Sequence, residues 1–162
     1  MTQNGPGASN PPIRPEPPWY AAYPAARNKD PATISRLDLL ALIKQGKKPG
    51  KDFILVDLRR TDHEGGTIRG SVNLPAQSLF PTIPTLYTLF KTANVSTVIW
   101  YCGSSRGRGN RAAAWFDDHI KDQGDLNMKS FVLVEGIKGW AGAGTDYVEL
   151  MDEYNEEAWR KQ

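Results

Sequence analysis

Short apolar runs alternate with helix-like stretches from residue 34 onward. The runs at 53–56, 70–74, 98–101 and 131–134 are predicted strands, and the stretches 36–45, 82–91, 110–122 and 147–160 are predicted helices. Ser35, followed three residues later by Asp38, forms a capping-box pattern at the first helix. Runs without period-2 alternation, separated by helices, are typical of parallel strands buried on both faces. The pattern therefore predicts an α/β fold with a central, mostly parallel sheet and helices on both faces.

The N-terminal part of the chain has a different composition. Eight of the twelve prolines precede residue 32, and residues 1–18 contain little that is apolar. We therefore expect a disordered Pro-rich tail over 1–18. Trp19, Tyr20 and Tyr23 follow abruptly, so residues 19–33 are predicted to form an aromatic arm packing on a domain that spans 34–162; a partner-binding motif is the alternative.

Composition and charge exclude several classes of protein. The net charge of +2 over 162 residues gives no reason to expect nucleic-acid binding, and no apolar run reaches the ~18 residues of a membrane-spanning helix. The chain has one cysteine and only two histidines, His63 and His119, which excludes an internal disulfide and makes a metal site implausible. We expect a cytoplasmic, or nuclear, monomer without a cofactor. Acidic residues at 149–157 are interpreted as a solvated face of the last predicted helix.

The strongest functional signal is a loop that runs from Cys102 to Arg108. It follows the predicted strand 98–101 and precedes the predicted helix 110–122, so the thiol lies at the carboxyl end of a strand, where α/β sheets bind ligands. Gly103 and Gly107 permit a tight backbone whose N–H groups can cradle an anion, and the helix N-terminus favours the same charge. Arg108 can place two hydrogen-bond donors on an oxyanion. A helix N-terminus and a nearby arginine also lower the pKa of a cysteine thiol from its usual ~8.5. Cys102 is therefore predicted to be a nucleophilic thiolate.

Four segments, in order and spacing, resemble the rhodanese-fold, M-phase-inducer type of cysteine phosphatase and its small relatives, some of which reduce arsenate. They are Val56-Asp57-Leu58-Arg59, the stretch from Gly65 to Leu74, the Cys102 loop with Gly109 and Arg111, and Glu135-Gly136-Ile137-Lys138-Gly139-Trp140. The resemblance covers roughly residues 34 to 141. It implies that Cys102 is the nucleophile that forms a phosphocysteine and that Arg108 stabilises the transition state. It further implies that Gly103, Ser104, Ser105, Arg106 and Gly107 form the amide cradle. Asp57 and Arg59 match a buried pair that supports the loop, and this structural role is favoured over general acid catalysis by Asp57.

The sequence also departs from the family pattern. Tyr101 stands where the family usually has His before the cysteine, and Thr67 where His usually follows the glycine pair. Gly107 replaces a loop Glu that the M-phase phosphatases carry, which leaves no obvious general acid. Glu64 and His63 are nearby candidates, although exposed turn residues are the favoured interpretation.

The resemblance leaves several functions open. The favoured one is hydrolysis of phosphotyrosine or related phosphate monoesters, and the alternative is arsenate reduction completed by an external thiol, glutathione with glutaredoxin. A sulfurtransferase of this fold typically has a loop one residue shorter, and an inactive rhodanese-like binding module would lack Cys102 or Arg108. Both of these are therefore disfavoured.

Overall fold

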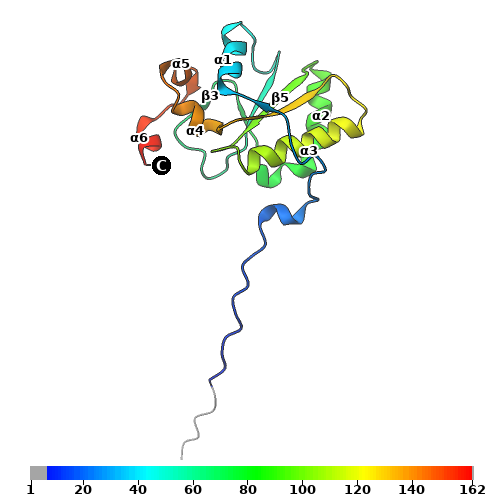
Figure 1. The fold of residues 1–162 in the computed structure, drawn as a ribbon, viewed down its shortest axis with the longest axis vertical. Helices are drawn as coiled ribbons and strands as arrows, with labels where there is room; N and C mark the ends of the chain where they lie inside the picture. The colour runs from blue at the N-terminus through cyan, green and yellow to red at the C-terminus, as the bar shows by residue number, and fades with distance from the viewer. Residues whose placement is uncertain (1–6, 162) are drawn as a thin grey trace, which may run out of the picture.

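The computed structural model describes residues 7–161 and contains a parallel five-stranded sheet (Figure 1). The strand order is β1-β6-β5-β2-β4. The strands are β1 (Thr33–Ile34), β2 (Ile54–Asp57), β4 (Val72–Asn73), β5 (Thr97–Tyr101) and β6 (Lys129–Leu133). All four pairings are parallel, with Asp57 opposite Tyr101 in the β2–β5 register. The predicted α/β fold with a mostly parallel sheet is confirmed.

Helices cover both faces of this sheet (Figure 1). On one face lie α2 (Ile83–Thr92) and α3 (Arg108–Asp122), and on the other lie α1 (Arg36–Lys44) and α4 (Gly136–Ala141). Side chains of β5 alternate between the two layers. Val98 and Trp100 join the core beneath α2 and α3, whereas Ile99 and Tyr101 join the core beneath α1 and α4. The central strand is thus buried on both faces, as its continuous apolar run predicts.

The first helix begins where the sequence indicates. Ser35 Oγ accepts a hydrogen bond of 3.0 Å from the main-chain N–H of Asp38, so Ser35 is the N-cap of α1. Short 3-10 turns η2 (Ala76–Ser78) and η3 (Phe80–Thr82) lead into α2. No helix within residues 7–161 is long and apolar enough to cross a membrane.

The C-terminal segment differs from the prediction. In place of one helix over 147–160 the structure has α5 (Thr145–Val148), β7 (Met151–Asp152) and α6 (Glu156–Arg160). Strand β7 pairs antiparallel with β3 (Thr67–Ile68), because Arg69 and the buried Met151 hold the segment against the domain. The prediction that residues 149–157 form one solvated helix face was therefore wrong.

Residues 19–28, the first part of the predicted N-terminal arm, lie along α3. This part begins with the 3-10 turn η1 (Trp19–Ala22). Trp19 and Tyr23 pack edge-on against Trp115, with ring centroids 6.1 and 6.0 Å apart, and Trp115 Nε1 donates to the carbonyl oxygen of Pro24 at 2.9 Å. These contacts fix the arm beside the start of α3.

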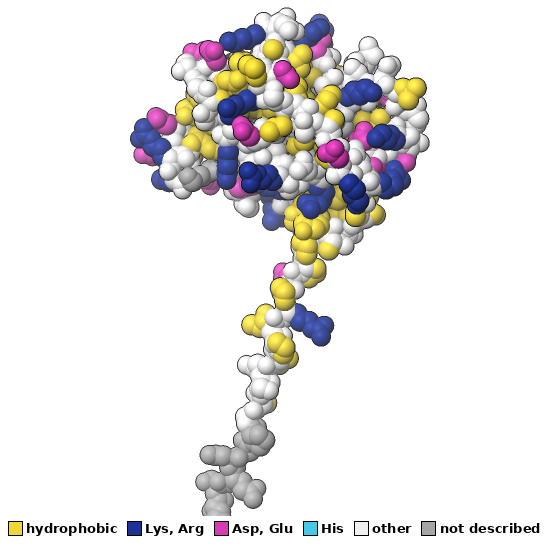
Figure 2. All heavy atoms as spheres, in the orientation of Figure 1, with side chains coloured by type: hydrophobic (Ala, Val, Ile, Leu, Met, Phe, Trp, Pro, Cys, Tyr) yellow, Lys and Arg dark blue, Asp and Glu magenta, His cyan; other side chains and the backbone are white. Residues whose placement is uncertain are grey.

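The tail before the arm extends away from the domain. Residues 7–18 are exposed and form no helix or strand, and Figure 2 shows the segment leading away from the domain. The predicted disordered tail over 1–18 falls partly on residues 1–6, which lie outside the described residues, so it stays a prediction.

Candidate active site

The loop between β5 and α3 places its cysteine at the carboxyl end of the central strand. Cys102 follows Tyr101 directly, and its side chain turns to the same side of the sheet as Trp100, toward α3. The residue is 3% exposed, so the sulfur lies at the inner end of a pocket. Arg108 is the first residue of α3 and lines the same pocket. The structure thus brings the two predicted catalytic residues together.

The loop carbonyls are held from behind by α4. The main-chain N–H groups of Ile137 and Lys138 each donate 3.0 Å hydrogen bonds, to the carbonyl oxygens of Cys102 and Gly103 respectively. A side chain at Gly136 would collide with this arrangement, because a Cβ there would lie 2.4 Å from the Cys102 carbonyl oxygen, and its φ is +59°. With its carbonyls directed at α4, the loop can turn amides toward the pocket.

Individual loop residues have different surroundings. Gly103, Ser104 and Gly107 line the pocket with Cys102. Ser105 is buried in a left-handed conformation (φ +64°), and its Oγ accepts a hydrogen bond of 3.3 Å from the main-chain N–H of Cys102. The Arg106 side chain is exposed on the outside of the loop and does not line this pocket. Any contact of these two residues with an oxyanion would therefore have to come from their main-chain N–H groups.

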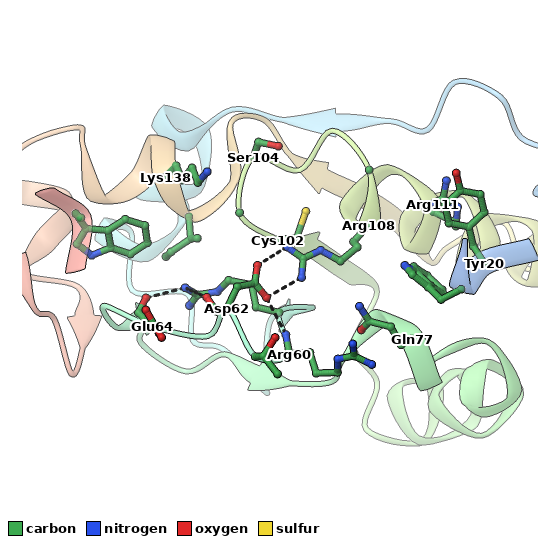
Figure 3. Close-up of a pocket in the computed structure, with 17 residues that line it drawn as sticks. Tyr20, Arg60, Asp62, Glu64, Gln77, Cys102, Ser104, Arg108, Arg111 and Lys138 are labelled. Atoms are coloured by element: carbon green, nitrogen blue, oxygen red, sulfur yellow. Dashed lines mark hydrogen bonds and ion pairs between the residues drawn. The ribbon is translucent and has the colours of Figure 1, made fainter. Parts of the chain in front are cut away.

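Arg108 has a carboxylate partner that the sequence does not indicate. Asp62 Oδ1 and Oδ2 accept hydrogen bonds of 2.9 and 2.6 Å from Arg108 Nη1 and Nη2 (Figure 3). This two-pronged pair holds the pKa of the Asp62 carboxyl well below its usual range. The Asp62 hydrogen bonds, with the nearby Cys102 sulfur, also raise the pKa of Arg108. In this state the carboxylate occupies the donors that an oxyanion would need.

Asp57 and Arg59 form the buried ion pair that the resemblance implies. Arg59 Nη2 lies 2.8 Å from Asp57 Oδ2, and both side chains are at most 2% exposed. The remaining Arg59 donors bind the carbonyl oxygens of Glu64 at 2.9 Å and Gly66 at 2.8 Å. The pair therefore fixes the segment 60–66, which carries Asp62. It supports the cysteine loop indirectly, through the partner of Arg108.

Tyr101 faces away from the cysteine. Its hydroxyl lies 2.8 Å from Thr67 Oγ1 and 2.6 Å from Ser71 Oγ, and Thr67 Oγ1 donates to Asp57 Oδ2 at 2.8 Å. Burial and the Asp57 charge raise the pKa of Tyr101 far above its usual value, so the hydroxyl keeps its proton. Tyr101 belongs to the network beneath the 60–66 segment and does not touch the thiol directly.

The pocket is wide, with a volume of about 790 Å³. Sequence analysis missed several residues that line it: Trp19, Tyr20, Arg60, Asp62, Gln77, Lys138 and Trp159. The N-terminal arm and the last helix both contribute to it, through Trp19 and Trp159 respectively. The aromatic cluster at 19–23 was the available signal for the arm, whereas nothing in the sequence singles out Gln77 or Trp159.

The two candidate general acids lie differently. Glu64 lines the pocket, and its main-chain carbonyl is fixed by Arg59. His63 Nε2 lies 3.4 Å from Asp57 Oδ2, so His63 faces the buried pair and does not line the pocket with Cys102. Within the described residues, no group of three or more His, Cys, Asp or Glu side chains could hold a metal ion.

A parallel sheet with a pocket at the carboxyl end of its central strand makes this an α/β protein of the ligand-binding type. The chain belongs to the rhodanese-like domain family, whose model matches residues 36–143. Arsenical-resistance protein 2 of Saccharomyces cerevisiae is 32% identical over 115 residues, which cover 66% of this chain and 85% of the yeast protein. The resemblance to the rhodanese-fold arsenate reductase and phosphatase family is thereby confirmed.

Two solved structures share the fold at 22% identity. The As-Sb reductase of Leishmania major superposes with a TM-score of 0.67, covering 75% of this chain and 85% of the reductase. Ygr203w, a yeast protein tyrosine phosphatase of the rhodanese family, superposes with a TM-score of 0.68, covering 80% of this chain and 96% of the phosphatase. At this identity the likeness establishes the fold, and the chemistry rests on the site itself.

Proposed function

We propose that the protein is a cysteine-dependent phosphatase that hydrolyses phosphate monoesters of the phosphotyrosine type. The observation that carries this proposal is the position of Cys102 and Arg108, which line one open pocket at the two ends of a loop sized for a tetrahedral oxyanion. The pocket is also much larger than an inorganic oxyanion, which is consistent with an ester substrate.

The reaction follows from this arrangement in two steps. The phosphoryl group takes the Arg108 donors from Asp62 and receives amide hydrogen bonds from the loop, while the Cys102 thiolate attacks phosphorus. The S–P bond forms as the ester P–O bond breaks, and the leaving oxygen departs as an alkoxide or phenoxide that takes a proton from solvent water. A second water then attacks phosphorus as the S–P bond breaks, which releases inorganic phosphate and the Cys102 thiolate, and the surplus proton of that water passes to solvent. Arg108 stabilises the charge that develops on the equatorial oxygens in both steps.

Arsenate reduction is the second candidate, and the 32% identity to Arsenical-resistance protein 2 favours it. Arsenate has the shape and charge of phosphate, so Cys102 would attack arsenic in the same pocket and displace water. Reduction of As(V) to As(III) requires two electrons. Because the chain has one cysteine, the second thiol must come from outside, from glutathione with glutaredoxin.

One comparison separates these two candidates. Purified protein is assayed with an aryl phosphate, and separately with arsenate, glutathione and glutaredoxin. Release of phosphate that is lost in Cys102→Ser supports the phosphatase. Glutathione-dependent turnover of arsenate with negligible phosphate release would overturn the phosphatase proposal in favour of arsenate reduction.

A further inference from the structure

The first two turns of α3 carry two arginines on one face. Arg108 binds Asp62, and Arg111 lies three residues later, which is about 4.5 Å farther along the helix axis. Both line the pocket that contains Cys102. Figure 3 shows Arg111 on the opposite side of Cys102 from Glu64 and Lys138.

The arm holds Arg111 in place by stacking. The guanidinium carbon of Arg111 lies 3.5 Å from the centre of the Tyr20 ring and 5.6 Å from that of Trp19. Stacking on a ring face fixes the guanidinium plane but leaves its N–H donors at the edge available for hydrogen bonds. Tyr20 and Trp19 themselves line the pocket, so this contact forms part of its wall.

The polar groups on this side lack protein partners. Within residues 7–161, neither Arg111 nor Arg60, which also lines the pocket, forms an ion pair with a carboxylate. Arginines that have no carboxylate partner in the protein are complementary to an acidic group on a ligand.

We propose that this surface, formed by Tyr20, Arg111 and Arg60, is a subsite for a second acidic group on the substrate. The enzyme then prefers phosphate monoesters that also carry a carboxylate or a second phosphate a few bonds from the ester. This rests on the proposed phosphatase function and adds the substrate class. The N-terminal arm has a specificity role here, since its Tyr20 supplies the ring that positions Arg111.

The test compares two esters. One is 4-nitrophenyl phosphate, and the other is a nitrophenyl phosphate with a ring carboxylate and a leaving group of matched acidity. We expect kcat/KM to be about tenfold higher for the carboxylated ester, a typical effect of one charge-assisted contact. The ratio should fall toward one in Arg111→Gln and Tyr20→Ala, and it should persist in Tyr20→Phe, which keeps the ring. Lys121→Gln removes a positive charge from α3 away from the pocket and should keep the ratio.

The outcomes distinguish the subsite from the phosphatase function. Hydrolysis of both esters at equal kcat/KM would overturn the subsite and leave the phosphatase intact. If the ratio of kcat/KM for the two esters is unchanged in Tyr20→Ala, the arm has only a structural role and its role in specificity is refuted. If neither ester is hydrolysed, calorimetry on Cys102→Ser still decides: tighter binding of the carboxylated ester, lost in the Arg111→Gln background, supports the subsite, and equal binding refutes it.

Discussion

Tyr101 Oη and Thr67 Oγ1 lie 2.8 Å apart, which joins the residue before Cys102 to the strand after Gly65 and Gly66. These are two of the positions at which the sequence departs from its family by lacking a histidine. The departures are therefore in contact, and together they link to Asp57 through Thr67. In this chain the two positions form part of a hydroxyl network beneath the 60–66 segment.

This network predicts a stability role for Tyr101. Tyr101→Phe removes a hydroxyl that contacts Thr67 and Ser71, and it should lower the free energy of unfolding by about 1–3 kcal/mol. Tyr147→Phe is the control, because the Tyr147 hydroxyl makes no hydrogen bond within the described residues. Urea unfolding gives the free energy of unfolding of both variants. Alkylation rates against pH report the Cys102 pKa, and a large shift with little loss of stability would instead make Tyr101 a thiol-activating residue.

The pair between Asp62 and Arg108 predicts competition with the substrate. Asp62→Asn should release Arg108 and tighten the binding of phosphate by about 2- to 5-fold, the range expected for a half-exposed ion pair. Calorimetry in a Cys102→Ser background measures this without turnover, with Glu64→Gln as the control for a pocket carboxylate that does not bind Arg108. Weaker binding in Asp62→Asn would show that Asp62 mainly orients the arginine.

Arg108 should not tolerate replacement by lysine. Lysine keeps the charge but loses the two-pronged geometry, so Arg108→Lys should lower kcat by about 10²–10³-fold. Cys102→Ser should abolish turnover while the protein still binds phosphate or sulfate. Near-normal rates in the first variant, or any retained turnover in the second, would remove that residue from the mechanism.

The hydrogen bonds of Asp125 should make the stability of the folded protein depend on pH in the acid range. Its carboxylate accepts hydrogen bonds from Tyr87 Oη at 2.7 Å and from the main-chain N–H groups of Asn127 and Met128. These bonds lower the pKa of Asp125 to about 2. Because the folded-state pKa is depressed, the stabilisation is present above pH ~4 and is lost as the pH falls toward 2. The Tm values of wild type and Asp125→Asn should converge as the pH falls from ~4 toward 2. A Tm difference that stays constant over this range would contradict the assignment.

Sequence patterns predicted the parts of the structure that depend on continuous or periodic signals. The apolar runs gave β2, β5 and β6, and glycines with a cysteine and an arginine at fixed spacing gave the loop. The β3–β7 pair escaped prediction because β7 lies inside residues 147–160, whose pattern indicated one helix, and its pairing with β3 spans more than 80 positions. Asp62 escaped because its contact with Arg108 spans 46 positions, a separation that only the folded chain closes.

Because the N-terminal arm and α6 each place a tryptophan in the pocket, the protein's own fluorescence can report on ligand binding. Trp19 and Trp159, near opposite ends of the chain, line the pocket with Cys102, whereas Trp100 and Trp140 are fully buried in the two cores. Occupation of the pocket changes the polarity around the first two indoles and leaves the buried two unchanged. Intrinsic fluorescence of the unlabelled protein can therefore follow binding directly, and comparison of Trp19→Phe with Trp159→Phe tells which wall the ligand touches.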